Sequence, residues 1–146
     1  MKVLVFGNPL LKEDNLPLRL LPSLRKSFPE TEFDEADPAD IDLEKGQLVV
    51  IDTAKGIDRV MLIEDASKLQ DYEMLSTHGL GLAEMLALMK AAGRKVDVKI
   101  VCVPQGMPQK KALTEVTKML RAIGLSRNAK RTTCRDHRPL SVSHTR

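Results

Sequence analysis

The amino-acid sequence predicts an α/β fold, a three-layer sandwich in which helices cover both faces of a mostly parallel, twisted sheet of about five strands. Two observations lead to this prediction. Short apolar runs rich in valine and isoleucine alternate along the chain with longer segments that have helical apolar spacing. The connections between these segments are short, and no internal repeat indicates a solenoid or a propeller.

Five segments have the composition or the alternation of strands. They are 2–7 (KVLVFG), 31–36 (TEFDEA), 47–52 (QLVVID), 59–64 (RVMLIE) and 98–104 (VKIVCVP). The first is an apolar run closed by Gly7, as expected of a strand that is buried on both faces. The second alternates and stops at Asp37-Pro38, which indicates a strand with one face in water.

Two later segments have clear helical features. Residues 79–92 are apolar on nearly every side and are followed by Gly93, so we expect a buried helix that is capped by Ser76 or Thr77. Residues 111–123 have apolar side chains at helical spacing and are followed by Gly124, a typical helix terminator.

The first helix is expected within residues 16–28 (LPLRLLPSLRKSF). Pro17 suits a first helical turn, because its missing N–H has no partner there in any case. Pro22 would clash with the preceding turn. This helix is therefore predicted to be either kinked or late in starting.

The composition is that of one globular domain. A chain of 146 residues with 42% hydrophobic residues can bury a sizeable core. No run approaches the ~18 apolar residues of a membrane span, and the N-terminal run turns acidic too soon for a signal peptide. Cys102 and Cys134 form neither a CxxC pair nor a zinc-ribbon spacing, which fits a reducing compartment. We therefore expect a cytoplasmic monomer without a membrane segment.

The charge is unevenly distributed along the chain. The formal net charge is +3, but residues 125–146 alone carry +5, which leaves −2 for residues 1–124. We interpret residues 1–124 as the α/β domain and residues 125–146 as a basic, disordered tail. The alternative is an arm that binds nucleic acid or another anionic surface, but a basic run without interleaved aromatic residues is weak support for it.

Polar residues occur where ligands collect in such sheets, beyond the carboxyl ends of the strands. Asp14 follows the first strand across the loop GNPLLKED, Asp52 ends the apolar run LVVID, and His78 opens the buried helix. Two carboxylates and one imidazole suit a borderline divalent metal such as nickel or zinc. Three protein ligands would leave positions open for water or substrate.

Each of these residues also has a purely structural interpretation. Asp14 could cap the first helix, where aspartate is a preferred residue. Asp52 could end its strand in solvent, which avoids the cost of burying a carboxylate. His78 could be a hydrogen-bonded core histidine, although a place at a helix amino end would keep the ring neutral and able to bind metal. Spacing alone leaves these alternatives open.

Three stretches, namely residues 3–20 (VLVFGNPLLKEDNLPLRL), 48–54 (LVVIDTA) and 76–93 (STHGLGLAEMLALMKAAG), resemble the hydrogenase maturation endopeptidases. These enzymes trim the carboxyl-terminal extension from the large subunit of nickel-iron hydrogenases. The similarity covers most of residues 1–123 in the same order. The family pattern of Gly-Asn, a leucine pair and an acidic doublet is filled here by Gly7, Asn8, Leu10, Leu11, Glu13 and Asp14.

The resemblance implies that Asp14, Asp52 and His78 bind nickel and form the catalytic site, with Glu13 as a reserve ligand or base. It also implies that the nickel is supplied by the hydrogenase large-subunit precursor, so that cleavage follows nickel insertion. Hydrolysis would then be metal-assisted. A serine triad does not fit, because His78 is the only histidine of residues 1–124. Cys102 lies in a predicted strand without a partner base and is interpreted as a core residue.

The sequence departs from the family pattern after the acidic doublet. Asn15 and Pro17 stand where the family usually has glycines, and residues 37–46 (DPADIDLEKG) are too short and broken for a helix that many relatives have. These departures leave room for a divergent member. The missing glycines are the only support for one alternative, a non-catalytic module that binds the nickel-loaded precursor.

A further alternative comes from residues 6–9 (FGNP), which also resemble the start of the peptidyl-tRNA hydrolases. The Thr-Arg-His-Asn continuation of that family is missing from this sequence. The negative balance of residues 1–124 disfavours a nucleic-acid partner, because phosphates are attracted to basic faces. The protease is therefore the preferred interpretation.

Overall fold

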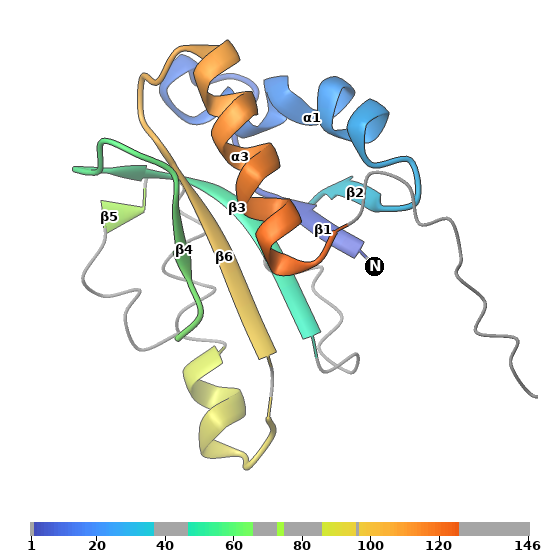
Figure 1. Cartoon of the computed structure of the whole chain (residues 1–146). Coiled ribbons are helices and arrows are strands. Elements are labelled where there is room, and N and C mark those ends of the chain that lie inside the picture. The colour runs from blue at the N-terminus through green and yellow to red at the C-terminus, as the bar shows by residue number, and fades with distance from the viewer. Residues whose placement is uncertain (1, 37–46, 66–72, 75–85, 96, 126–146) are drawn as a thin grey trace, which may run out of the picture.

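The computed structural model describes residues 2–36, 47–65, 73–74, 86–95 and 97–125, which form one sheet with helices packed on it (Figure 1). The strands are β1 (Lys2–Val5), β2 (Glu32–Glu35), β3 (Gln47–Lys55), β4 (Met61–Ile63), β5 (Glu73–Met74) and β6 (Asp97–Pro104). The main path of the sheet has the order β2-β1-β3-β6-β4, and β5 pairs with β3 beside this path.

The sheet is mostly parallel, as the sequence predicts. β1 pairs in parallel with β2 and β3, and β3 pairs in parallel with β6. β4 runs antiparallel to β6, and β5 runs antiparallel to β3. Each of the predicted strands is present. Strand β5 was not predicted, because a strand of 2 residues has no readable period.

Two helices, α1 (Leu16–Ser27) and α3 (Gln109–Ile123), lie next to each other on one face of the sheet (Figure 1). Odd-numbered residues of β1, β3 and β6 face these helices. The first core therefore joins strand residues with helix residues: Val3, Val5, Val49, Ile51, Val101 and Val103 with Leu20, Leu24, Val116 and Leu120. Its strand members are mostly valine, as expected of strands that are buried on both faces.

Even-numbered residues of the same strands form a second core on the opposite face. It includes Phe6, Val50 and Ile100, and it is joined by Leu86 from a helical segment at residues 86–91. This segment lies near the amino end of β6, in yellow in Figure 1. The prediction of a helix buried on nearly every side is wrong for its described part, because only Leu86 and Met89 are buried there and Leu88 is 71% exposed. Helices thus cover both faces of the sheet, and the predicted three-layer α/β fold is confirmed.

The helix ends follow the predicted chemistry with two differences. Gly93 and Gly124 have positive φ angles of 76° and 110°, which glycine adopts without strain. Helix α3 begins at Gln109, two residues before the predicted start, directly after Pro108. The proposed late start of the first helix is wrong, because α1 begins at Leu16 and continues through Pro22, which lies on its exposed side.

None of the helices in the described ranges is long and apolar enough to cross a bilayer.

The chain remains part of the core until Leu125. This residue is 4% exposed, belongs to the first core and donates its N–H to the carbonyl of Leu120 at 3.0 Å. Residues 37–46 and 126–146, as well as the predicted cap at Ser76 or Thr77, lie outside the described residues. The nature of the basic tail stays a prediction.

We expect truncation of a buried leucine to lower the free energy of unfolding much more than truncation of an exposed one. Leu20→Ala removes a fully buried side chain from the first core and should lower the free energy of unfolding by about 2–5 kcal/mol. Leu88→Ala, at a position that is 71% exposed, should change it by less than about 0.5 kcal/mol. Urea denaturation of both variants measures the difference, and equal effects would contradict the assignment of the core.

Candidate functional site

The candidate acids lie at the carboxyl edge of the parallel strand pair β1 and β3. These strands are in register, with Val5 opposite Ile51, and the N–H of Phe6 extends the pairing by donating to the carbonyl of Ile51 at 2.9 Å. Beyond this point β3 continues to Lys55, whereas the chain after β1 turns into the loop of residues 7–15. The site is therefore built from this loop and from the last residues of β3.

Asp14 is held at this edge by its own main chain. It is the last residue of a short 3-10 helix, η1 (Lys12–Asp14), and its carbonyl accepts the N–H of Asn8 at 3.1 Å. A side chain at Gly7 would come within 2.7 Å of the same carbonyl oxygen, so the close approach of the two segments requires glycine.

The capping interpretation of Asp14 is wrong, because the N-cap residue of α1 is Asn15. The Asp14 side chain is only 4% exposed. Asp14 is therefore a buried acid in the residue before the N-cap of α1.

Asp52 lies inside β3 and not at its end. It is 0% exposed, and the strand continues through Thr53, Ala54 and Lys55. The alternative in which this carboxylate escapes into solvent is therefore wrong. The N–H of Thr53 donates to Oδ1 of Asp52 at 2.8 Å, which fixes the orientation of the carboxylate. Polar contacts of this kind lower the cost of burying a carboxylate.

Asp52 lies on the face of the sheet against which the helical segment at residues 86–91 packs. Its even number places it on the face of the second core, between Val50 and Ala54. The helical segment at residues 86–91 packs on that face, and His78 precedes this segment in the sequence. His78 and the side chain of Glu13 lie outside the described residues, so their roles stay predictions.

Asp14 and Asp52 thus both lie close to residues 6–8, which follow β1. The carbonyl of Asp14 accepts the N–H of Asn8, and Asp52 follows Ile51, whose carbonyl accepts the N–H of Phe6. The structure does not complete a metal site from the described ranges alone, in which no three side chains of histidine, cysteine, aspartate or glutamate converge to hold a metal. A metal ion held by these two carboxylates would need at least one further ligand from outside the described residues. The donor chemistry fits a divalent cation with one further nitrogen ligand.

Cys102 is a neighbour of Asp52 that sequence reasoning did not connect with it. The two residues are opposite each other in the parallel pairing of β3 and β6 and lie on the same face. Burial, and secondly the charge of Asp52, raise the pKa of the Cys102 thiol to about 12. The thiol is therefore neutral at physiological pH and is not a nucleophile, which agrees with its interpretation as a core residue. Only the strand register reveals the pairing.

Sequence analysis also missed two further buried polar groups next to the candidate acids. The hydroxyl of Thr53 and the amide oxygen Oδ1 of Asn15 are buried and have no hydrogen-bond partner among the described residues. Thr53 follows Asp52 and Asn15 follows Asp14, so each candidate acid has such a neighbour. The aspartate that precedes each one is the only sequence signal that could have pointed to them.

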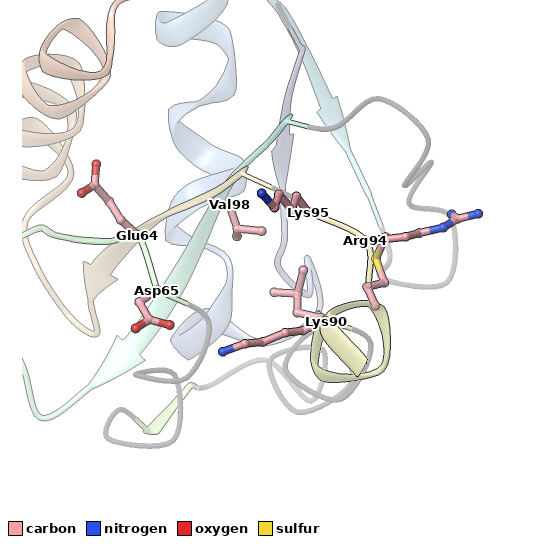
Figure 2. Close-up of a pocket in the computed structure, with 8 residues that line it drawn as sticks. Glu64, Asp65, Lys90, Arg94, Lys95 and Val98 are labelled. Atoms are coloured by element: carbon pink, nitrogen blue, oxygen red, sulfur yellow. The ribbon is translucent and has the colours of Figure 1, made fainter. Parts of the chain in front are cut away.

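A cavity of about 310 Å³ lies at the opposite edge of the sheet, near the amino end of β6 (Figure 2). Its lining consists of Glu64, Asp65, Leu86, Met89, Lys90, Arg94, Lys95 and Val98. Figure 2 shows the acidic side chains on the side of the segment after β4, whereas Lys90 extends from the helical segment. Neither Asp14 nor Asp52 is among the described residues that line this cavity. We therefore place the candidate site at the carboxyl edge.

The raised pKa of Cys102 predicts a specific pH dependence of stability. Below pH 9 the thiol is protonated in both the folded and the unfolded chain, whereas at higher pH only the unfolded chain loses the proton until the pH approaches about 12. The free energy of unfolding should therefore fall by about 1–2 kcal/mol more in the wild type than in Cys102→Ala between pH 9 and pH 10.5. Urea denaturation at several pH values measures this, and parallel pH profiles would contradict the assignment.

The buried hydroxyl of Thr53 predicts an unusual response to an isosteric substitution. Thr53→Val keeps the shape of the side chain and removes a hydroxyl without a partner in the described part of the chain. We expect the free energy of unfolding to stay the same or to rise by about 1 kcal/mol. Thermal denaturation measures this. A loss of more than about 1 kcal/mol would show that the hydroxyl is hydrogen-bonded in the folded protein.

Comparisons with known proteins bear on the fold. No protein-family model matches the chain, and no curated protein does. The structure is similar to that of the hydrogenase maturating endopeptidase HybD from E. coli, with 21% identity and a TM-score of 0.59 over 85% of this chain and 94% of that chain. It is also similar to the solution structure of an endopeptidase from Escherichia coli, with 21% identity and a TM-score of 0.54 over 86% of this chain and 96% of that one. The chain therefore shares the fold of these endopeptidases over nearly their whole length.

Proposed function

We propose that the protein is an endopeptidase that removes the carboxyl-terminal extension from the large-subunit precursor of a nickel-iron hydrogenase after nickel insertion. The observation that carries this proposal is the burial of Asp14 and Asp52 at one carboxyl edge. The fold shared with HybD and the sequence resemblance of the stretches around Asp14, Asp52 and His78 support the same function.

The proposed substrate explains why two carboxylates would be buried at this edge. Carboxylate side chains are oxygen ligands of divalent cations, and a bound cation compensates the charge of a buried carboxylate. A divalent cation that arrives with the precursor would compensate both charges and take oxygen ligands from Asp14 and Asp52. His78 would supply the nitrogen ligand that a borderline metal such as nickel favours. Recognition of the substrate would then depend on the metal that it carries.

The protein's own residues have distinct roles in this proposal. Asp52, oriented by the N–H of Thr53 at 2.8 Å, offers a preorganised ligand that needs no rearrangement when the substrate binds. Asp14 is fixed through its carbonyl by Asn8 and Gly7, so its position depends on the loop and not on a flexible side chain alone. When bound, the metal polarises the scissile carbonyl or lowers the pKa of a water molecule that attacks it.

The proposal predicts a large loss of activity from substitution of each proposed metal ligand. Asp14→Asn, Asp52→Asn and His78→Ala should each reduce cleavage of a nickel-loaded precursor by at least about 100-fold, because each removes a metal ligand. Asp58→Asn, a change of an exposed aspartate, is the matched control and should leave the rate unchanged. Mass spectrometry of the precursor with time measures the rates.

The same measurement separates the proposal from its alternatives. A shortened precursor supports the protease. An intact precursor in a stable complex indicates the non-catalytic binding module, and cleavage of peptidyl-tRNA with an untouched precursor indicates the peptidyl-tRNA hydrolase. Full activity of any one of the three variants would remove that residue from the site.

A further inference from the structure

Two adjacent leucines are exposed beside the candidate site. Leu10 is 90% exposed and Leu11 is 54% exposed, and both lie in the loop that leads to Asp14. Single exposed leucines are common on protein surfaces and need no explanation. This pair differs because it belongs to a continuous exposed run, residues 9–12, between the buried Phe6 and the buried Asp14.

Hydrogen bonds within the loop hold the leucine pair in place. Asn8 accepts the N–H of Leu10 on its side-chain oxygen at 3.0 Å and the N–H of Leu11 on its carbonyl at 3.1 Å. The carbonyl of Leu11 accepts the N–H of Asp14 at 3.1 Å, and the carbonyl of Asp14 accepts the N–H of Asn8 at 3.1 Å. The loop is thus closed on itself, so little conformational entropy would be lost when a partner covers the leucines.

The same hydrogen bonds make the leucine surface continuous with the candidate site. One bond links Leu11 directly to Asp14, and the loop starts at Gly7, where the chain passes β3. A polypeptide whose cleaved bond lies at Asp14 and Asp52 therefore has to pass over or beside this loop. Lys12, which is exposed next to the pair, favours a partner with an acidic group at that point.

We propose that Leu10 and Leu11 form a docking surface for the substrate polypeptide, specifically for an extended apolar segment next to the cleaved bond that also carries a negative charge. This inference rests on the proposed endopeptidase function and specifies how the substrate is held. The surface supplies apolar contact area, and Lys12 supplies charge complementarity. The leucines take no part in the chemical step.

The test compares a double variant, Leu10→Asp with Leu11→Asp, with the matched control Leu88→Asp. The control changes a leucine that is 71% exposed on the helical segment at residues 86–91. We expect the double variant to raise the KM for the nickel-loaded precursor at least tenfold and to change kcat less than twofold. Leu88→Asp should leave both constants unchanged. Lys12→Glu should raise the KM at least threefold, and an unchanged KM would overturn the acidic part of the proposal.

An unchanged KM in the double variant, or an equal rise in Leu88→Asp, would overturn the docking surface. Circular dichroism verifies that each variant is folded, and the smaller changes Leu10→Ser and Leu11→Ser replace the double variant if it is not. If the wild type does not shorten the precursor, the proposed function fails, and a direct binding measurement with the precursor then tests the docking surface. If the wild type binds the precursor and the double variant does not, the docking surface is supported. If the wild type does not bind the precursor, the docking surface is overturned.

Discussion

The burial of Asp52 in the middle of β3 is the constraint on which the site depends. A carboxylate in an otherwise apolar strand lowers stability unless polar partners or a cation compensate its charge. One carboxylate oxygen of Asp52 accepts the N–H of Thr53. On the adjacent strand β6, Asp52 lies opposite Cys102, whose thiol is neutral.

The loop after β1 supplies the second half of the site by different means. Asp14 owes its position to main-chain hydrogen bonds and to the absence of a side chain at Gly7, which lets the loop approach the strand closely. The geometry is therefore set mainly by the backbone. The same closed loop buries the carboxylate and exposes the leucines, so the chemical group and the proposed substrate contact are parts of one rigid unit.

Most of the fold could be predicted from the sequence because buried parallel strands are read as continuous apolar runs, and Gly93 and Gly124 end their helices as glycine commonly does. The end of β3 was not located correctly, because the apolar run stops at Asp52 whereas the strand continues to Lys55. What could not be predicted depends on register and packing. The pairing of Asp52 with Cys102 requires the alignment of β3 with β6, and the exposure of Leu10 gives no periodic signal in a loop.

The central claim is that Asp14, Asp52 and His78 bind one cation. Anomalous diffraction from a crystal soaked with nickel or cadmium tests this claim without any assumption about the substrate. The account predicts one strong peak at the carboxyl edge, about 2.0–2.3 Å from a carboxylate oxygen of each aspartate and from the imidazole of His78. A peak only at the cavity near Glu64 and Asp65, or no peak at the edge of β1 and β3, would contradict it.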